Sequence, residues 1–345
     1  MPTPRRSGRR GTAQCPCRHP VPVDHPGSTA EIVDVCTFYR FARIENPEEV
    51  RQRLLAEGEQ CQLRGTVLLG LEGINSTLCG RRESLEQFLD TVRRIPGFGD
   101  LTAKFSRAAA DNQVFHRLKV RVKEEIVTLG VLGVDPSKRT GTHVSAERWN
   151  DLLDDPDVVV IDTRNRYECE IGTFPGALQP DTGSFREFPD WVKTHLDPDK
   201  HLRIAMFCTG GIRCEKASAF MLESGFAEVF HLDGGILRYL ETVAPDDNRW
   251  AGECFVFDQR VSVDPSLGEG EFSQCFACRR PVSAAEREHP DYREGVSCPN
   301  CAGTFTETQL AAFTERRRQV VLAEQRGERH IGQKQLPGKK TATPN

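Results

Sequence analysis

The sequence lacks long apolar stretches. Nowhere in its 345 residues does an uninterrupted apolar run approach the roughly 18 residues that a membrane-spanning helix needs. The N-terminal stretch MPTPRRSGRRGTAQ is basic but has no apolar segment behind it, so it does not fit a secretory signal. No flavin or other nucleotide-cofactor signature and no 2-His-1-carboxylate iron pattern stands out. These absences predict a cytoplasmic protein without a membrane partner, a nucleotide cofactor or an evident obligate protein partner.

Cysteine, in contrast, is plentiful, because the chain has 13 of them. The number is odd and the spacing is uneven, which does not fit the disulfide scaffold of a small secreted protein. In a reducing compartment such residues are metal ligands, reactive thiols or small buried apolar groups. Five of them carry no motif and are predicted to be core residues: Cys36, Cys61, Cys79, Cys169 and Cys254.

The net charge is only −4, but the charges are unevenly distributed. Residues 1–20 contain five arginines and no acidic residue, whereas residues 142–241 contain ten basic and eighteen acidic residues. Basic ends around an acidic centre favour a polyanionic partner held outside the central part. For the ends by themselves, solvated tails are the preferred interpretation, and we expect disordered basic tails at residues 1–30 and 316–345.

Residues 31–133 have the pattern of a compact domain. IVDVCTFY and LTAKFS are typical of strands, and GTVLLGLEG with INSTLCG predicts a strand pair that turns at Glu72 and Gly73. PEEVRQRLLAEG predicts an amphipathic helix that begins at Pro47, and RRESLEQFLDTVRRIPG predicts a second helix that Pro96 stops. The order β-α-β-β-α-β predicts a ferredoxin-like, or acylphosphatase-like, α+β sandwich.

A strictly alternating segment lies at residues 117–123. Its apolar residues, Leu118, Val120 and Val122, are expected to pack inward, because successive strand residues point to opposite faces. The other face carries only cations, and exposed strand faces are often charged. Four like charges without an interleaved acidic residue repel one another, however, which favours a polyanion such as RNA as a partner. The candidate RNA-binding residues on this strand are Arg117, Lys119, Arg121 and Lys123.

A second, larger domain is predicted at residues 144–250. The preceding stretch, VDPSKRTGTH at residues 134–143, is polar and rich in turn formers, which predicts a linker. Apolar strands such as VVVIDTR and HLRIAMFC are separated by helices such as RCEKASAFMLESGF. This alternation predicts a parallel α/β sheet covered by helices on both faces.

The stretch MFCTGGIRCEK lies where one of these strands ends and the next helix begins. Sites in open α/β sheets form at the carboxyl ends of strands. Gly210 and Gly211 let the backbone curl so that successive N–H groups point at one spot, and the helix N-terminus and Arg213 also favour negative charge there. A thiol in that field loses its proton more easily. The loop is therefore predicted to be an anion cradle around a nucleophilic Cys208.

The length of this loop separates two kinds of chemistry. Cysteine phosphatases place one more residue between the Cys and the Arg, whereas four residues separate Cys208 from Arg213. The smaller loop suits a sulfane sulfur on the thiolate and disfavours a phosphatase. Cys214, about one helical turn away, is either a resolving thiol for an oxidised or persulfidated Cys208 or a buried residue of the first helical turn.

The loop pattern C-x-x-G-x-R resembles a rhodanese active site. IDTRNRYECEIGTFPGAL resembles the upstream segment of rhodanese domains, with Asp162, Arg164 and Glu168 at matching positions, and HLDGGILRYLE resembles their closing segment. Asp162 and Arg164 are predicted to form a structural ion pair. Over about residues 31–315, EGINSTLCG, KEEIVTLG, CTGGIRCEKAS, HLDGGI and VFDQRV, in this order, resemble the rhodanese-domain tRNA uridine hydroxylases.

This resemblance implies an oxidoreductase that modifies tRNA. The family converts the wobble uridine, position 34, to 5-hydroxyuridine, so dioxygen is the expected co-substrate and the anticodon loop of tRNA the expected partner. Bases of an anticodon loop are already single-stranded, which makes them accessible. The resemblance also implies that Cys208 is the active cysteine and a persulfide carrier. Two alternatives stay open: a sulfurtransferase that moves sulfane sulfur through a Cys208 persulfide, and a non-catalytic RNA-binding or redox-sensing protein.

A small module with two C-x-x-C pairs is predicted at residues 251–315. The segments QCFACRR and SCPNCAG place nineteen residues between the pairs, a spacing typical of a zinc ribbon. Four thiolates complete a tetrahedral shell without an open position, so the site is expected to be structural, with zinc favoured over iron. The predicted metal ligands are Cys275, Cys278, Cys298 and Cys301. The helical stretch that follows carries three further candidate RNA contacts, Arg316, Arg317 and Arg318, which are otherwise a solvated helix face.

Overall fold

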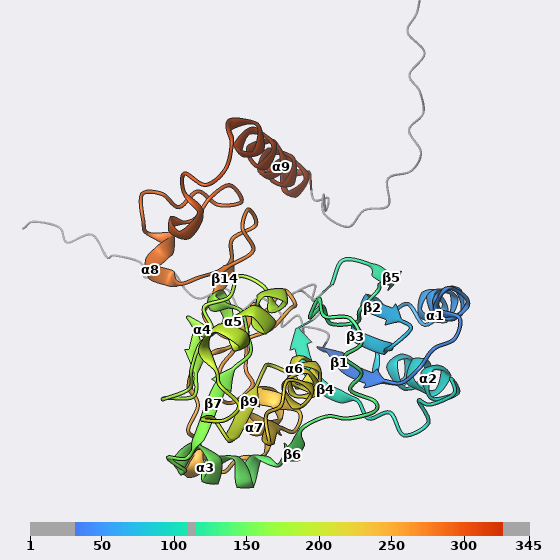
Figure 1. The fold of residues 1–345 in the computed structure, drawn as a ribbon. Helices are drawn as coiled ribbons and strands as arrows, with labels where there is room; N and C mark the ends of the chain where they lie inside the picture. Colours follow the sequence, from blue (N-terminus) through green and yellow to red (C-terminus); the bar gives the residue numbers. More distant parts are fainter. Residues whose placement is uncertain (1–31, 110–114, 327–345) are drawn as a thin grey trace, which may run out of the picture.

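The computed structural model describes residues 32–109 and 115–326 (Figure 1). The tail predicted for residues 1–30 and the last part of the tail predicted for residues 316–345 lie outside the described residues. Three parts follow one another along the chain: an N-terminal sheet domain, a central α/β domain and a module around the four-cysteine cluster. Among the helices of the described residues, none combines the length and the apolar character needed to cross a membrane.

The N-terminal domain has the predicted order of elements. Its sheet has the order β4-β1-β3-β2-β5, in which β5 is parallel to β2 and the other neighbours are antiparallel. This is the expected acylphosphatase-like fold with one additional edge strand. The elements are β1 (Ile32–Phe41), α1 (Pro47–Gln60), β2 (Arg64–Gly70), β3 (Gly73–Gly80), α2 (Arg82–Arg93), β4 (Lys104–Ala109) and β5 (Leu118–Val122).

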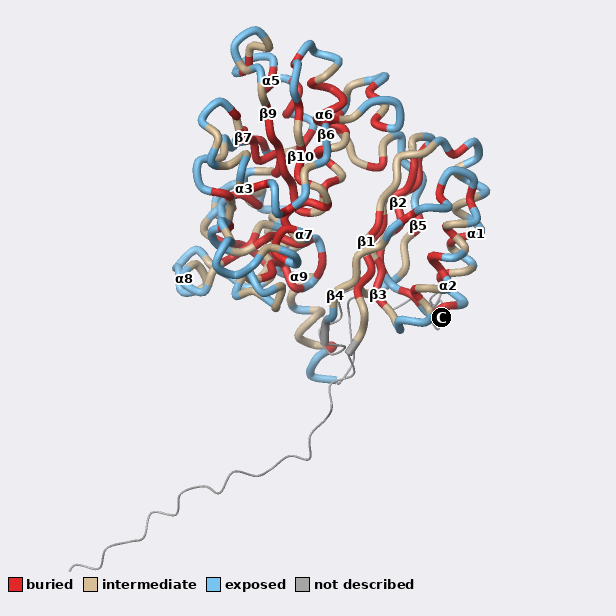
Figure 2. The backbone as a smooth tube through the Cα atoms, turned by 90° about the horizontal axis from the view of Figure 1, so that it is seen from below, coloured by how far each residue is buried: buried red, intermediate tan, exposed pale blue. Residues whose placement is uncertain are grey.

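The helices α1 and α2 cover one face of this sheet. On α2, Leu85, Phe88, Leu89 and Val92 recur at helical spacing, and all four are buried. On α1, Pro47 occupies the first turn, where its missing N–H group costs no helical hydrogen bond. The other face of the sheet is turned towards the central domain (Figure 2). Because α1 and α2 cover only one face of the sheet, the opposite face is available for contacts between domains.

The cation-bearing strand β5 follows the prediction only in part. Val120 is buried as expected, but Val122 is 41% exposed and Leu118 is half-buried. Leu118 nevertheless packs against the core of this domain, so the expectation that all three apolar residues pack inward is wrong only for Val122. The reason is the position of β5 at the edge of the sheet, where a strand has a neighbouring strand on one side only.

The central domain contains the predicted parallel sheet, with the order β6-β10-β9-β7. Four of the five residues of β9 are buried, as expected for an inner strand covered on both faces. Helices α5 and α6 contribute to the core on one face, and α3 and α7 to the core on the other. The elements are β6 (Thr142–Val144), α3 (Ala146–Asp154), β7 (Val158–Asp162), α4 (Arg166–Cys169), β8 (Gly172–Thr173), α5 (Phe188–His195), β9 (Arg203–Phe207), α6 (Ile212–Glu223), β10 (Glu228–Leu232) and α7 (Gly235–Thr242).

The borders of the central domain differ from those expected from the sequence. Leu129 and Val134 are buried in its core, and His143 already belongs to β6, so residues 134–143 are not only a linker. At the other end, β11 (Ala251–Gly252) pairs with β8, and Cys254 and Val263, on β12 (Cys254–Phe255) and β13 (Ser262–Val263), lie in the same core. These segments are short and irregular and are anchored by single apolar side chains, so no periodic pattern marks them.

The C-terminal module begins after this point. It contains β14 (Ser273–Gln274), β15 (Pro281–Val282), α8 (Ala284–Arg287) and the long helix α9 (Glu307–Gln325). Thr306 caps α9 by accepting a hydrogen bond from the backbone N–H of Gln309, whose side chain accepts from the N–H of Thr306. Helix α9 runs across residue 316, so residues 316–325 are helical, as the predicted helical stretch around Arg316, Arg317 and Arg318 indicates.

Candidate active site at the Cys208 loop

The Cys208 loop joins the end of β9 to the start of α6. Gly211 has a φ of +99°, a left-handed conformation that residues with a side chain rarely adopt. A Cβ atom on Gly211 would also lie 2.8 Å from the hydroxyl oxygen of Tyr39. A Cβ atom on Gly210 would meet nothing within 4 Å. Of the two glycines predicted to shape the loop, Gly211 is therefore the one that the turn requires.

The sulfur of Cys208 accepts hydrogen bonds from the loop around it. The backbone N–H of Gly211 donates to Cys208 Sγ at 3.1 Å. Burial opposes ionisation, but the Cys214 thiol, the charge of Arg213 and the N–H groups of these two residues outweigh it and lower the pKa of the Cys208 thiol from 9.0 to about 5. This geometry supports a thiolate at neutral pH. The residue is only 1% exposed, so other parts of the chain cover the loop.

Cys214 lies on the first turn of α6 and is fully buried. Its Sγ is 3.6 Å from the hydroxyl oxygen of Thr163. Burial, and then the neighbouring Cys208, raise the pKa of the Cys214 thiol well above its ordinary value. Cys214 therefore keeps its proton and donates a hydrogen bond to the sulfur of Cys208. This position is compatible with both roles considered for Cys214, the resolving thiol and the buried helix residue.

Arg213 does not close the loop with a free guanidinium group. Its Nη1 and Nη2 donate to the two carboxylate oxygens of Glu168, each at 2.7 Å. Both side chains are buried, and a buried charge needs a partner of opposite sign. Arg213 therefore favours negative charge at Cys208 through its own charge, from a position that Glu168 holds.

The predicted structural ion pair between Asp162 and Arg164 is confirmed. Arg164 Nη2 lies 2.6 Å from Asp162 Oδ2, and both side chains are 0% exposed. The guanidinium group also donates to the carbonyl oxygens of Glu168 and Gly172. The pair thus ties the end of β7 to α4 and β8, the segment that carries Glu168.

A lysine of the N-terminal domain that no sequence motif marks reaches the loop. Lys104, the first residue of β4, donates to the carbonyl oxygens of Gly234 at 2.6 Å and Gly210 at 3.3 Å. Burial lowers the pKa of Lys104, while the negative charges of Asp233 and Cys208 act in the opposite direction. No local pattern marks Lys104, because it comes near Cys208 only when the two domains dock.

Helix α6 is also held to the N-terminal sheet by side chains. Lys216 is 2% exposed and forms ion pairs with Glu72 at 2.8 Å and with Glu125 at 2.5 Å. The hydroxyl group of Tyr39, on β1, donates to the carboxylate of Glu215 at 3.3 Å. Glu72 and Glu125 lie in the segments EGINSTLCG and KEEIVTLG. These two motifs therefore build the contact between domains beside the loop.

One exposed aromatic residue lies beside Arg213. Phe257 is 61% exposed, and its ring centroid is 5.7 Å from the guanidinium carbon of Arg213. It belongs to the segment VFDQRV, which is anchored by a buried ion pair of 2.6 Å between Asp258 and Arg260. The ring of Phe255 packs edge-on against it at 5.1 Å. The segment thus presents an aromatic face to solvent from a fixed position.

The four cysteines of the C-terminal module converge as predicted. All four Sγ atoms lie within 4.8 Å of one another, and three of the distances between pairs are 3.6, 3.7 and 3.8 Å. Two thiolates bound about 2.3 Å from a tetrahedral zinc ion are about 3.8 Å apart, so the donor set fits a closed metal site. The cluster can hold a metal ion, and the ligands would be Cys275, Cys278, Cys298 and Cys301.

The candidate RNA-binding residues on and beside β5 lie near the C-terminal module. Arg117, Arg121 and Lys123 are exposed, and Lys119 is half-buried. Burial first, and then the neighbouring charges of Arg117, Arg121 and Arg279, lower the pKa of Lys119. Since Arg279 belongs to the cysteine module, the cationic surface continues from β5 onto that module.

The three arginines of α9 have partners within the chain. Arg316 donates to the carbonyl oxygens of Phe276 and Gly295 at 2.7 and 3.2 Å, which holds α9 against the module. Arg317 and Arg318 form ion pairs with glutamates at 2.6 and 2.8 Å. Their role as phosphate contacts stays a prediction.

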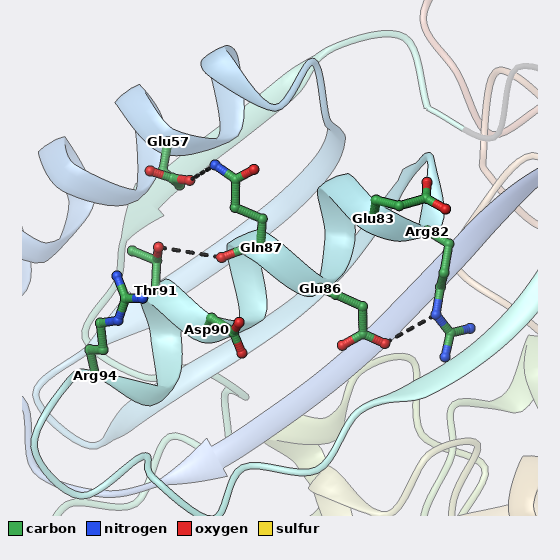
Figure 3. Close-up of a pocket in the computed structure, with 8 residues that line it drawn as sticks. All are labelled: Glu57, Arg82, Glu83, Glu86, Gln87, Asp90, Thr91 and Arg94. Carbon is green, nitrogen blue, oxygen red and sulfur yellow. Dashed lines mark hydrogen bonds and ion pairs between the residues drawn. The ribbon is translucent and has the colours of Figure 1, made fainter.

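A groove of about 660 Å³ lies elsewhere, along the outer side of α2 and α1 (Figure 3). Polar residues that line it bond with one another, as in the hydrogen bonds from Arg82 to Glu86 and from Gln87 to Glu57. These helices cover the sheet face opposite to the one that contacts the Cys208 loop (Figure 2). The groove is therefore separate from the candidate active site. Its lining residues are Glu57, Arg82, Glu83, Glu86, Gln87, Asp90, Thr91 and Arg94.

Comparison with known proteins identifies both larger domains. A family model for the UPF0176 acylphosphatase-like domain matches residues 33–126, and one for the rhodanese-like domain matches residues 145–242. A rhodanese-like domain from Anabaena is 19% identical, with 33% of this chain and 80% of that chain covered and a TM-score of 0.27. A rhodanese-related protein from Thermoplasma volcanium is 22% identical, covering 30% and 95%, with a TM-score of 0.26. An acylphosphatase from Bacillus subtilis is 17% identical, covering 26% and 98%, with a TM-score of 0.21. With the two family models in this order along one chain, the protein belongs to the UPF0176 family of rhodanese-domain proteins.

Proposed function

We propose that this protein is a tRNA-modifying enzyme that hydroxylates the wobble uridine, position 34, to 5-hydroxyuridine with dioxygen. The reaction itself is inferred from the resemblance of the five sequence motifs to the tRNA uridine hydroxylases. The observation that carries the proposal is the sulfur of Cys208, which accepts the N–H of Gly211 and has a strongly lowered pKa. Such a thiolate is the nucleophile or the persulfide carrier of the reaction.

The chemistry needs more than the thiolate. Placing one oxygen atom of dioxygen on C5 of the uracil ring and reducing the other to water consumes two electrons and two protons. The reaction therefore requires a two-electron reductant besides dioxygen. In this proposal Arg213 and the N–H of Gly211 keep Cys208 ionised, and Glu168 holds Arg213 in place. The Cys214 thiol donates a hydrogen bond to the sulfur.

RNA binding is supported by an aromatic residue beside the loop and by a cationic surface on and beside β5. Phe257 is an exposed aromatic face beside Arg213, and unpaired bases stack on such faces with about 1–3 kcal/mol per base. The cations on and beside β5 continue towards Arg279 of the cysteine module, which we propose holds zinc. A cationic surface of this kind binds the phosphate backbone. We propose that an anticodon loop lies across the cationic surface and that its target base is placed near Phe257.

The covered position of Cys208 sets a condition for the reaction. The residue is 1% exposed, and Tyr39 and Lys104 of the N-terminal domain lie against its loop. A base reaches the sulfur only if this cover shifts. The N-terminal domain therefore both binds RNA and controls access to Cys208 in this proposal.

Nucleoside mass spectrometry tests the reaction. In tRNA from a strain that lacks this protein, 5-hydroxyuridine should be lost, and the wild-type chain should restore it. The Cys208→Ser variant should fail to restore it, whereas Cys61→Ser, at a position outside every motif, should restore it fully. Undiminished 5-hydroxyuridine with Cys208→Ser would contradict the proposed role of the thiolate.

A sulfurtransferase is the second candidate function. It is favoured by the match of residues 145–242 to the rhodanese-like domain and by the short loop, which leaves four residues between Cys208 and Arg213. In that case Cys208 attacks a sulfane sulfur donor, carries the sulfur as a persulfide and passes it to an acceptor. The same tRNA samples distinguish the two functions, since a sulfurtransferase acting on tRNA would cause the loss of a thiolated nucleoside instead of a hydroxylated one.

A further inference from the structure

Two histidines and a glutamate far apart in the sequence converge beside α6. His143 on β6 and His231 on β10 are register partners in parallel strands, so their side chains project from the same face of the sheet. Their ring centroids are 4.1 Å apart. Glu215, on the first turn of α6, reaches both rings from above this face. Its Oε1 lies 2.9 Å from His143 Nε2, and its Oε2 lies 3.9 Å from His231 Nε2.

Within the part of the chain that the structure describes, not every polar atom of this cluster has a strong hydrogen-bond partner. The side chain of Glu215 is 12% exposed, and the two imidazoles are its ion-pair partners. His231 is 1% exposed; within the described residues its Nδ1 has no hydrogen-bond partner, and its Nε2 has a long contact of 3.5 Å to the hydroxyl of Thr140. The carboxylate of Glu215 also accepts hydrogen bonds from the hydroxyl groups of Thr140 and Tyr39, at 3.0 and 3.3 Å. The unmet bonding need is therefore that of the buried His231 ring, which a bound cation would stabilise.

We propose that His143, Glu215 and His231 bind a divalent first-row transition-metal ion. Donors about 2.1 Å from one ion lie about 3–3.4 Å apart at neighbouring positions and at most about 4.2 Å apart. The three donor atoms lie within 4.8 Å of one another. A small movement of the exposed His143 side chain would bring all three within the distances of one coordination shell. Two imidazole nitrogens and one carboxylate suit iron, manganese, cobalt or zinc.

This site differs chemically from the four-cysteine cluster. Three protein ligands leave coordination positions for water or another small molecule, whereas four thiolates leave none. The side chain of His143 is 45% exposed, which gives the ion a path from solvent. The hydroxyl group of Tyr39 contacts Glu215 and also lies against the Cys208 loop, so one residue links the two places. The metal site stands whether or not Cys208 performs the proposed reaction.

Metal content of the full, untagged chain tests the proposal. We expect metal-free protein reconstituted with Co²⁺ to bind two ions per chain, of which the cysteine cluster holds one with intense thiolate-to-cobalt absorption. His143→Ala and Glu215→Gln should each weaken binding of the second ion by about 100-fold or more without changing that absorption. His195→Ala, at an exposed histidine on α5, is the matched control and should retain both ions.

The variants also separate metal loss from misfolding. Cys278→Ser should remove the thiolate-to-cobalt absorption and leave the second ion in place. Because His143 is partly exposed, His143→Ala should keep the thermal unfolding temperature of the wild-type chain. One Co²⁺ per chain in the wild type, or a second ion that both His143→Ala and Glu215→Gln retain, would show that the cluster is only a hydrogen-bonded His–Glu network and would overturn the proposal.

Discussion

The ammonium group of Lys104 donates a hydrogen bond of 2.6 Å to the carbonyl oxygen of Gly234, a residue of a different domain. Gly234 precedes α7 in a turn that packs tightly on the active loop, since a Cβ atom on Gly235 would lie 2.4 Å from the carbonyl oxygen of Cys208. The bond thus fastens the N-terminal sheet to the loop. The acylphosphatase-like domain is therefore part of the candidate site and not a separate appended unit.

Replacing Lys104 should uncover Cys208. A hydrogen bond from a charged group contributes about 1.5–3 kcal/mol. Lys104→Met should therefore shift the equilibrium between docked and undocked domains towards the undocked state by about tenfold or more. We expect a similar increase in the rate at which iodoacetamide alkylates Cys208 at pH 8, measured by mass spectrometry. Since the Cys208 pKa is lowered to about 5, loss of one nearby cation leaves the thiolate fraction high at that pH. Lys193→Met, on the exposed side of α5, is the control, and an equal rate in both variants would refute the role of Lys104.

The reactivity of Cys208 should depend on pH in an unusual way. Its pKa is lowered to about 5, so the reactive thiolate persists as the pH falls and is lost only near pH 5. The titratable groups that interact with the sulfur include Arg213 and Cys214 from α6, Lys104 from β4, Tyr39 from β1 and Cys254 from β12.

We expect the alkylation rate of Cys208 to be flat between about pH 7 and pH 9. Burial raises the pKa of Cys61, so the rate at Cys61 in the same chain should rise throughout this range. Peptide mass spectrometry reports both residues in one sample. An inflection of the Cys208 profile near pH 9 would contradict the anion-stabilising loop.

Removing only one partner of the buried Arg213–Glu168 pair should strongly lower the free energy of unfolding. Arg213→Met leaves the carboxylate of Glu168 buried without a partner, which costs about 3–5 kcal/mol. The double variant with Glu168→Gln should recover a good part of this loss. All three tryptophans lie in the central domain, so urea unfolding followed by tryptophan fluorescence measures it.

An exposed ion pair provides the comparison for that variant. Arg249 pairs with Asp154 at 3.3 Å, and both side chains are more than half exposed. Arg249→Met should therefore change the free energy of unfolding by less than about 1 kcal/mol. If Arg213→Met costs no more than Arg249→Met, the burial of the Arg213–Glu168 pair does not matter energetically.

Removing the metal from the cysteine module should unfold that module alone. Cys298→Ser breaks a four-thiolate set whose sulfurs lie within 4.8 Å of one another. We expect the zinc content to fall by one ion per chain and limited proteolysis to cut within residues 271–326, because a metal of this kind holds a polar module together. The tryptophan-reported unfolding of the central domain should not change. Cys61→Ser should retain the metal, and an unchanged zinc content in Cys298→Ser would show that the cluster is not a metal site.

The cations of β5 should contribute to RNA binding through their charge. If Lys119 and Arg121 each neutralise one phosphate, the variants Lys119→Ala and Arg121→Ala should each reduce the slope of log affinity against log salt by about 0.7 for a single-stranded loop. Filter binding or fluorescence anisotropy with an anticodon stem-loop measures this. Arg53→Ala, on the exposed side of α1, should leave the slope unchanged. Equal slopes in all three variants would place the RNA elsewhere.

Local patterns in the sequence were enough to predict much of this protein. Apolar spacing on α2 and the apolar runs of β7 and β9 indicate their elements, because burial acts on neighbouring residues along a helix or strand. The Cys208 loop and the two C-x-x-C pairs are also local, since a tight turn is built from adjacent residues. The ion pair of Asp162 and Arg164 is local as well, since the two residues are only two positions apart at the end of β7.

The tertiary structure alone decided the contacts between distant residues. Lys104 meets Gly234 across 130 positions, His143 meets Glu215 across 72, and the partner of Arg213 is 45 positions upstream. A single sequence carries no periodicity that relates such pairs, because their meeting depends on how two domains dock and how helices pack on a sheet. The chain's local patterns therefore determine where the thiol lies and which turn surrounds it. Packing determines which charges are neutralised beside it, what covers it and which side chains gather next to it.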